Sequence, residues 1–295
     1  MEPRIVVPQA FLDMPRWWHD GAEWLAALPG TAEAVCRRWG LRLDGEPQHG
    51  SNALVLPVRR GDELLALRLT PPGPEVGEQV AALRFWAGRG TVRLEAADLA
   101  AGAMLLERLA MDGSLRALPI EEALAVLGTM MRRLATPAPA SVPSTAEIVA
   151  GRAAALPSDW ERLGRPFDKA FLMSAADSAA RLTQRDGFLA VNGDLHSGQV
   201  LRGTREPWLT VDPVLLRGDI AYDLARVLWT RVDEMPDRAS ITEHFDAAVQ
   251  AAGIEAERGR NSVLFRAVDY WLWGLRVGLT EDPERCRRLL IALST

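Results

Sequence analysis

The sequence is poor in cysteine. Its 295 residues contain two, Cys36 and Cys286, which lie far apart in the chain and inside helical patterns. Two isolated cysteines provide neither a disulfide framework nor the ligand spacing of a zinc site. We therefore expect two reduced, packed thiols, and we exclude a small fold held together by disulfides.

Long apolar runs are also missing. No stretch approaches the roughly 18 to 20 residues that are needed to span a bilayer. The first residues, Met1-Glu2-Pro3-Arg4-Ile5, lack the basic and then apolar pattern of a secretory signal. We therefore expect a cytoplasmic protein with no membrane partner.

The charge balance is close to neutral. The formal net charge is −5, and 25% of the residues are charged. Proteins that bind nucleic acid concentrate positive charge on one face to neutralise phosphates, so we expect no nucleic-acid partner. The small acidic excess is compatible with a cationic small-molecule substrate. The oligomeric state is left open by the sequence.

The sequence has no internal repeat and no Gly-x-x-x-x-Gly-Lys-Ser/Thr loop of the P-loop type. Its first part mixes strand and helix patterns. Residues 31–39 form an expected helix with Thr31 as its cap. Two apolar runs, 53–58 and 64–69, flank a glycine-containing turn and predict a β-hairpin, and a further helix follows Pro74.

The later part of the chain is mainly helical. The segment Met111-Asp112-Gly113-Ser114 is rich in turn residues and is the predicted connector between two domains. We therefore expect an N-terminal domain over residues 1–109 and a helical C-terminal domain over residues 110–295. The window 188–217 interrupts the helices with short apolar strands separated by glycine and charge.

The chemistry is concentrated in that window. An apolar strand ends in Asn192-Gly193-Asp194-Leu195-His196-Ser197-Gly198-Gln199 before a second apolar strand resumes, and Asp212-Pro213 ends a third strand. Phosphoryl transfer needs one carboxylate to orient the attacking hydroxyl and another to hold magnesium against the phosphates. Asp194 alone, in its glycine-rich loop, would more simply form a turn, and Asp219 after Gly218 has the place of a helix N-cap.

Taken together, these residues resemble the aminoglycoside phosphotransferase family, and most closely its streptomycin and hydroxyurea kinase branch. That family's loop reads His-Gly-Asp-Leu-His-x-Gly-Asn, followed by Asp-Pro or a similar pair and by Gly-Asp-x-x-x-Asp-Leu-Ala. The corresponding residues here are 192–199, then 212–213, then 218–225. The resemblance implies an α+β, protein-kinase-like two-lobe fold, with a small β-sheet-plus-helix N-lobe and a larger, mainly helical C-lobe.

The resemblance also implies roles for individual residues, with ATP and Mg²⁺ as cofactors. Asp194 would be the catalytic base and Asp212 a magnesium ligand, with Gln199 as the second. The segment from Glu107 to Leu109 would present backbone groups to adenine. Three further residues would meet the phosphates or support that contact: Asn52, Arg68 and Gln79.

The chain departs from the family pattern at four positions. Arg68 replaces a lysine, Gln79 replaces a glutamate, Gln199 replaces an asparagine, and Asn192 replaces a histidine. An arginine keeps the charge of a lysine but has a wide planar head, and Gln199 places its amide oxygen one methylene further out. These changes keep a second hypothesis open, a pseudokinase-like protein that binds nucleotide or a small molecule with little or no transfer.

The favoured hypothesis is a kinase that phosphorylates a hydroxyl of a small, aminoglycoside-like cation, with antibiotic resistance as its family role. Nucleotidyl transfer on the same scaffold is a third possibility, to which no residue points. The candidate substrate-binding residues come from the C-terminal lobe: Asp219, Asp223, His196, Asp233 and Asp269. For Asp223, which lies on the motif helix, support of the catalytic loop is the favoured role.

Overall fold

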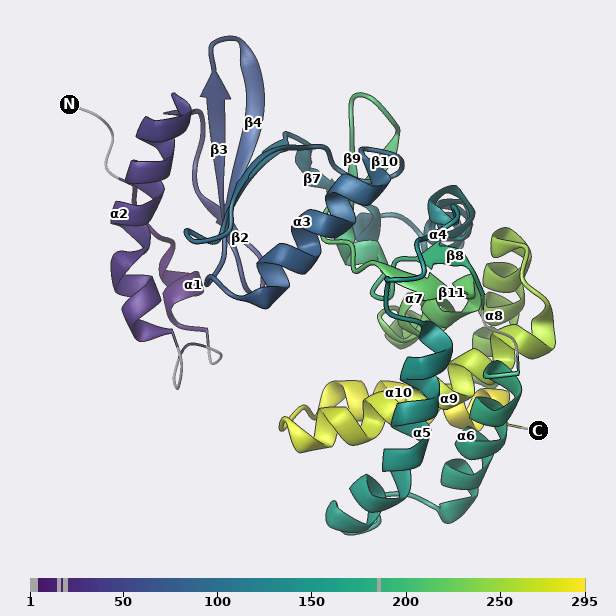
Figure 1. Cartoon of the computed structure of the whole chain (residues 1–295). Coiled ribbons are helices and arrows are strands. Elements are labelled where there is room, and N and C mark those ends of the chain that lie inside the picture. The colour runs from purple at the N-terminus through teal and green to yellow at the C-terminus, as the bar shows by residue number, and fades with distance from the viewer. Residues whose placement is uncertain (1–4, 15–16, 18–20, 185–186, 295) are drawn as a thin grey trace. The chain divides into compact units, whose positions relative to one another are not determined.

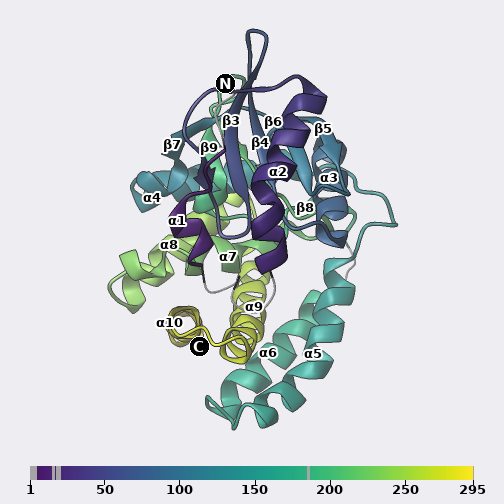
Figure 2. The same ribbon diagram turned by 90° about the vertical axis from the view of Figure 1, so that its left-hand side faces the viewer.

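The computed structural model describes residues 5–14, 17, 21–184 and 187–294. The chain divides into two compact units. Unit 1 contains the chain up to residue 111 together with residues 202–209, and unit 2 contains residues 112–201 and the chain from residue 210 onward. Figures 1 and 2 show the strands of unit 1 and the helices of unit 2.

Unit 1 is built on a six-stranded antiparallel sheet in the order β1-β3-β4-β6-β5, with β2 paired to β3. The predicted hairpin forms its centre, and Gly61 makes the turn at a φ of 60°. Its strands are β1 (Arg42–Leu43), β2 (Gln48–His49), β3 (Leu54–Arg60), β4 (Glu63–Leu69), β5 (Leu94–Asp98) and β6 (Ala103–Glu107).

Helix α2 (Ala22–Trp39) covers one face of this sheet, as Figure 2 shows. Alternate strand residues such as Leu56 and Leu67 form a core with Leu28 of the helix. The expected start of this helix at Thr31 is wrong. The helix begins at Ala22 and runs through Pro29, because its apolar face continues across the proline, and the Thr31 hydroxyl donates to the Ala27 carbonyl instead of capping.

Among its described residues, unit 1 also contains the α-helices α1 (Gln9–Leu12) and α3 (Pro74–Trp86). Helix α3 starts at Pro74 as predicted, and it buries Val76, Val80 and Leu83. Since Arg68 alternates with Leu67 and Leu69 along β4, it points to the sheet face opposite α2 and reaches Gln79 of α3. The fold thus places a candidate phosphate-binding cation beside a helix.

Unit 2 is mainly helical. Helix α9 packs against α6 and α10, and α4 packs against α8. Its helices are α4 (Ile120–Leu134), α5 (Thr145–Arg162), α6 (Lys169–Leu182), α7 (Leu224–Trp229), α8 (Arg238–Ala252), α9 (Ala256–Arg276) and α10 (Glu281–Leu293). Short 3₁₀ helices lie between its strands and helices: η2 (Leu115–Ala117), η3 (Ser197–Gln199), η4 (Ile220–Asp223) and η5 (Val232–Glu234).

Two small antiparallel ribbons position the chemistry-bearing loops. Strand β8 (Leu189–Val191) pairs with β11 (Leu216–Gly218), with Val191 opposite Leu216. Strands β9 (Val200–Arg202) and β10 (Trp208–Thr210) lie next to each other in a sheet whose third strand is β7 (Ala110–Ser114). The whole segment 111–114, expected to be a turn-rich connector, is therefore strand, because β9 offers it a pairing partner.

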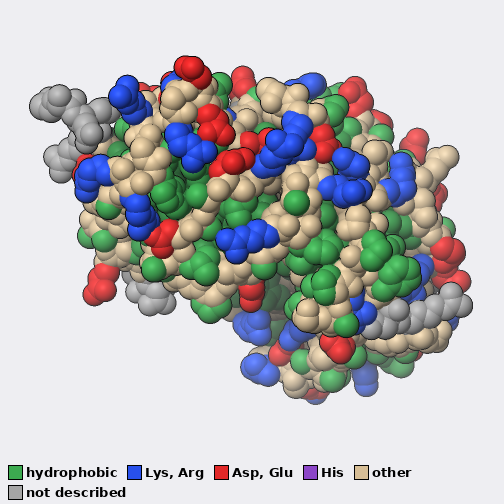
Figure 3. Space-filling model, turned by 45° about the horizontal axis from the view of Figure 1, so that its top comes forward, with side chains coloured by type: hydrophobic (Ala, Val, Ile, Leu, Met, Phe, Trp, Pro, Cys, Tyr) green, Lys and Arg blue, Asp and Glu red, His purple; other side chains and the backbone are tan. Residues whose placement is uncertain are grey.

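The predicted α+β fold class is confirmed: a sheet with helices forms unit 1, and unit 2 is largely helical. Within the residues that the structure describes, no helix has both the length and the apolar character to cross a bilayer. Acidic and basic side chains are interspersed over the face shown in Figure 3.

Candidate active site

The loop after β8 makes a tight turn at Gly193. The φ of Gly193 is 67°, and a Cβ there would lie 2.8 Å from Cδ1 of Leu216. A residue with a side chain would therefore suffer both backbone strain and a clash. The Asp194 N–H donates to the Asn192 carbonyl at 2.7 Å, which closes the turn. Glycine thus lets the chain reverse and present Asp194.

The segment after β10 is held against the same loop. The Val211 N–H donates to the Gln199 carbonyl at 2.9 Å. The Val214 N–H lies 3.2 Å from the Asn192 carbonyl oxygen and 3.1 Å from the Asn192 side-chain oxygen. Asp212 lies between these two attachments, so unit 2 brings the backbones that carry the two predicted carboxylates together.

Both oxygens of the Asp194 carboxylate have a polar partner. Oδ1 lies 2.6 Å from Nε of Arg226, and Oδ2 accepts from Nε2 of Gln199 at 2.9 Å. The contact with Arg226 is an ion pair rather than a hydrogen bond, because the Nε–H bond is not aimed at the oxygen. The Asp194 side chain remains 34% exposed, so a substrate can still reach it.

Only one of the two polar amide atoms of Gln199 makes a hydrogen bond within the described part of the chain. Its nitrogen donates to Asp194, while within the described part of the chain its buried Oε1 has no hydrogen-bond partner. Buried polar atoms in folded proteins nearly always have a partner, which can be a protein group, an ordered water or a bound ion. Asp212 and Gln199 are the two candidate metal-binding residues of this loop pair.

Asp223 lies beneath the loop and is 2% exposed. Burial raises the pKa of its carboxyl to about 7; the charge of Arg266 opposes this rise, and the nearby Asp194 adds to it. The backbone N–H groups of Leu195 and Asn192 donate to the Asp223 carboxyl. These contacts are those of a residue that holds the loop from within.

His196 caps the short helix η3. Its Nδ1 accepts from the Gly198 N–H at 3.2 Å, so the neutral ring carries its proton on Nε2. Burial lowers the pKa of His196 to about 4, assisted by the charges of Arg226 and Arg116 and opposed by Asp194. His196 is therefore neutral in the folded protein near pH 7.

The half-buried His196 predicts a loss of stability in acid. Its folded pKa lies below the ordinary value of 6.5, so the unfolded chain binds more protons between pH 6.5 and pH 4. The free energy of unfolding should fall across that window by at most about 3 kcal/mol from this group. His196→Asn keeps an acceptor for Gly198 and should flatten the dependence in urea unfolding at pH 7 and pH 4.5.

The control for this prediction is an exposed side chain of unit 1 that does not titrate. Gln48→Asn should leave the slope between pH 7 and pH 4.5 as it is in the wild type. If the free energy of unfolding of His196→Asn depended on pH as it does in the wild type, His196 would not be the source of the predicted loss of stability.

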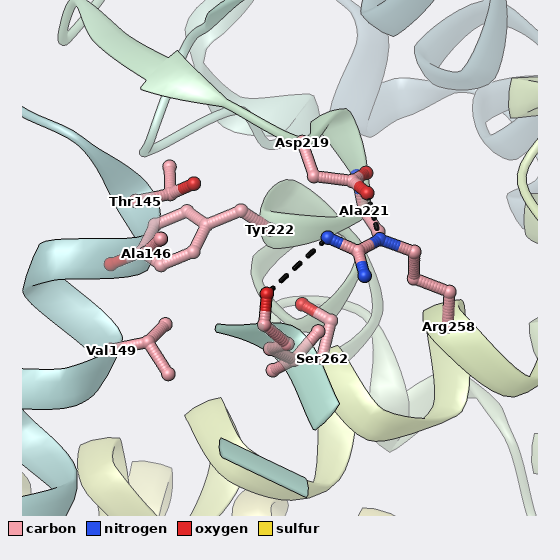
Figure 4. A pocket seen from close by; sticks show the side chains of 9 residues that line it. Thr145, Ala146, Val149, Asp219, Ala221, Tyr222, Arg258 and Ser262 are labelled. Carbon is pink, nitrogen blue, oxygen red and sulfur yellow. Dashed lines mark hydrogen bonds and ion pairs between the residues drawn. The ribbon is translucent and has the colours of Figure 1, made fainter. Parts of the chain in front are cut away.

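Asp219 performs the predicted capping role. Its Oδ1 accepts from the Ala221 N–H at 2.8 Å, and its Oδ2 pairs with Arg258 of α9. Figure 4 shows the carboxylate turned toward this arginine at the edge of a small pocket that Thr145 and Tyr222 also line. The Asp219 carboxylate is thus occupied by local contacts.

The other two predicted substrate acids also pair with arginines. Asp233 on η5 lies 2.6 Å from Nη2 of Arg285, and 57% of its side chain is exposed. Asp269 on α9 lies 2.7 Å from Nε of Arg152 and is 25% exposed. A cationic substrate would therefore have to compete with a guanidinium at either carboxylate.

Within unit 1, the residues predicted near the phosphates are joined to one another. Arg68 is 7% exposed, and its Nη1 donates to Oε1 of Gln79 at 2.7 Å. Its Nη2 lies 3.4 Å from Oδ1 of Asn52, in the turn before β3. The adjacent Glu78 is exposed, so Gln79 is the residue of α3 that meets the cation.

At the end of β6, one backbone N–H group is already hydrogen-bonded within the protein. The Glu107 N–H donates to the Arg93 carbonyl at 3.0 Å, so this N–H is not the group that adenine could meet. The Glu107 side chain accepts from Arg205 at 2.7 Å. Leu109, two residues further on, is buried.

Sequence reasoning missed Arg226. It follows Asp223 by three residues, so the short α7 carries it on the same side as the buried acid. An arginine one helical turn after Asp223 can be recognised in the sequence. Its pairing with Asp194, 32 positions earlier, depends on how the loop folds back over α7.

Comparisons with known proteins bear on this arrangement. Residues 38–278 match the family described as aminoglycoside/hydroxyurea antibiotic resistance kinase. The chain is 37% identical to the hydroxyurea phosphotransferase of Kitasatospora aureofaciens over 272 residues, which cover 90% of this chain and 78% of that protein. It is 35% identical to the streptomycin 6-kinase of Streptomyces griseus over 270 residues, covering 88% and 87%.

A solved structure agrees with the fold. An aminoglycoside phosphotransferase in ternary complex with ADP and hygromycin B superposes with a TM-score of 0.62, covering 89% of this chain and 98% of that one. The sequence identity is 15%, so this likeness concerns the fold alone.

Proposed function

Because the chain belongs to the family of aminoglycoside/hydroxyurea antibiotic resistance kinases, we propose that it transfers a phosphoryl group from ATP to a hydroxyl of a small antibiotic-like molecule. The resemblance inferred from the loop at 192–199 is thereby confirmed at the level of the family. The observation that carries the proposal is the attachment of the Asp212 segment to both ends of the Asp194 loop.

In this proposal Asp194 is the base. A carboxylate has about four lone-pair positions, so one that is held by Arg226 and Gln199 can still accept a hydrogen bond from a substrate hydroxyl. The hydroxyl oxygen attacks the terminal phosphorus of ATP, and the bond between that phosphorus and the oxygen that leaves with ADP breaks. The hydroxyl proton passes to Asp194. Asp223 keeps the loop in place during this step.

Asp212 and Gln199 are the proposed magnesium-binding residues. The buried Oε1 of Gln199, which lacks a partner among the described residues, and the carboxylate of Asp212 are hard oxygen ligands that fit this ion. Bound magnesium would neutralise charge on the phosphates. The described residues contain no group of three or more His, Cys, Asp or Glu placed for a metal, and Mg²⁺ at phosphates commonly uses one or two protein ligands.

Arg68 is the proposed contact to the phosphates, in the N-terminal domain over residues 1–109 that would cover the nucleotide. The chain has a single lysine, Lys169 at the start of α6, so an arginine supplies the charge in the sheet. Gln79 and Asn52 fix the direction of that guanidinium. Glu107 and Leu109 flank the backbone proposed to meet adenine.

The acceptor is proposed to be a small, cationic, aminoglycoside-like molecule bound by the C-terminal lobe, residues 110–295. Among the acids predicted to meet it, Asp233 has the most exposed carboxylate, followed by Asp219 and Asp269. Consumption of ATP supports the cytoplasm as the compartment of the reaction.

The test is a product assay with MgATP and either streptomycin or hydroxyurea, the molecules named in two relatives. We expect the mass of one acceptor to rise by one phosphoryl group, and a nucleotidyl increment would contradict the proposed reaction. Nucleotide binding in a thermal-shift assay, without ATP consumption in the presence of either acceptor, would favour the pseudokinase-like alternative.

A further inference from the structure

Arg226 lies between the proposed base and a group of aromatic side chains. Its Nε is 2.6 Å from Oδ1 of Asp194, and 19% of its side chain is exposed. Its guanidinium carbon lies 5.4 Å from the centre of the Trp229 ring and 5.6 Å from that of Tyr270. Both distances fall in the range in which a cation is attracted to an aromatic face.

Tyr270 is itself fixed from several sides. Its ring stacks on Trp229 at 4.3 Å and on Trp273 at 4.9 Å between centroids. Its hydroxyl donates to Oδ2 of Asp282 at 3.1 Å and lies 3.4 Å from Nη1 of Arg226. Burial raises the pKa of Tyr270 to about 12, so the hydroxyl keeps its proton and accepts from Arg226 while it donates to Asp282.

The geometry points to Arg226 as a positioning residue for phosphoryl transfer: it holds the Asp194 carboxylate in one orientation, and Tyr270 and Trp229 hold Arg226. This inference rests on the proposed function, in which Asp194 is the base. Gln199 holds the second oxygen, so the carboxylate is restrained at both atoms and its free lone pairs face a defined direction.

Arg226 also offsets charge. Asp194 and Asp212 would both face a triphosphate, and two carboxylates with no cation beside them would repel it. A guanidinium at 2.6 Å from Asp194 reduces this repulsion without covering the 34% of the side chain that is exposed. Arginine suits the place because its planar head stacks on aromatic rings, which a lysine ammonium does less well.

The main test is chemical rescue of Arg226→Ala. Removing the side chain frees the carboxylate to rotate, and a displacement of about 1 Å can cost about 100-fold in rate. We therefore expect kcat to fall about 100-fold while KM for ATP changes little. Added guanidinium chloride should restore much of kcat by entering the space beside the aromatic rings, and sodium chloride at the same concentration should not.

Two conservative variants refine the result. Arg226→Lys keeps the charge but loses the planar head, so its kcat should lie between those of wild type and Arg226→Ala. Tyr270→Phe keeps the stacked ring and removes the hydroxyl alone, so the fall in kcat should be smaller than in Arg226→Ala. Arg181→Ala, which removes an exposed arginine paired with Glu257, is the matched control and should turn over at the wild-type rate.

Wild-type kcat in folded Arg226→Ala would overturn the inference. So would a loss of kcat that guanidinium leaves unchanged and that is matched by a loss of folded protein in thermal unfolding. Asp194→Asn separates this inference from the proposed function. If that variant is inactive while Arg226→Ala turns over normally, only the role of Arg226 fails; if it is fully active, the assigned base fails.

Discussion

Asp194→Asn should lose phosphoryl transfer by about two to four powers of ten and bind MgATP with nearly unchanged affinity. A positioned general base contributes a rate factor of this size, and an amide cannot take up the hydroxyl proton. The side-chain oxygen of asparagine can still accept from Gln199, so the loop keeps one of its two restraints. The measurements are kcat from product mass and nucleotide affinity from thermal shift.

The matched control is another aspartate of unit 2. Asp177 is exposed on α6, and Asp177→Asn should leave both values as they are in the wild type. Transfer at the wild-type rate by Asp194→Asn would reject Asp194 as the base, whatever its effect on nucleotide binding.

Asp212→Asn is the second variant with a large expected effect, and its pattern should differ. Replacing a charged ligand with a neutral one weakens the hold on the cation, so the Mg²⁺ concentration for half-maximal rate should rise. The rate at saturating Mg²⁺ should fall by about two to three powers of ten, the usual cost of removing one electrostatic contact to a transition state. Titrating the rate with Mg²⁺ at fixed ATP measures both quantities.

The two variants should differ in how nucleotide binding depends on Mg²⁺. Asp194→Asn should keep the wild-type dependence of nucleotide binding on Mg²⁺, while Asp212→Asn should lose it. If Asp212→Asn showed the wild-type Mg²⁺ dependence, Asp212 would not be a metal ligand.

Local signals predicted much of the fold. The hairpin around Gly61, the helix after Pro74 and the cap at Asp219 each follow from a few neighbouring residues, and all three are present. Local reasoning failed at α2, where Thr31 was expected to cap a helix that in fact begins at Ala22 and runs through Pro29. It also failed at β7, since a strand made of turn residues depends on its partner β9.

Most residues of the candidate site could be predicted from the sequence, but their contact partners could not. The order strand, glycine loop and strand in the sequence identified Asp194 and Asp212. Asp269 contacts Arg152, which lies 117 positions away in the chain, and no residue near either of them predicts this contact. The choice of Gln79 over Glu78 likewise depends on which face α3 turns to Arg68, a property of packing rather than of sequence spacing.

A crystal structure with Mg²⁺ and a non-hydrolysable ATP analogue tests the proposed roles of Asp194, Asp212 and Gln199 most directly. The account predicts one Mg²⁺ at the phosphates, bound by a carboxylate oxygen of Asp212 and by Oε1 of Gln199 at about 2.1 Å, with Asp194 outside the metal shell. Phosphates and metal bound away from Asp212, or Asp194 acting as the metal's ligand in its place, would contradict it.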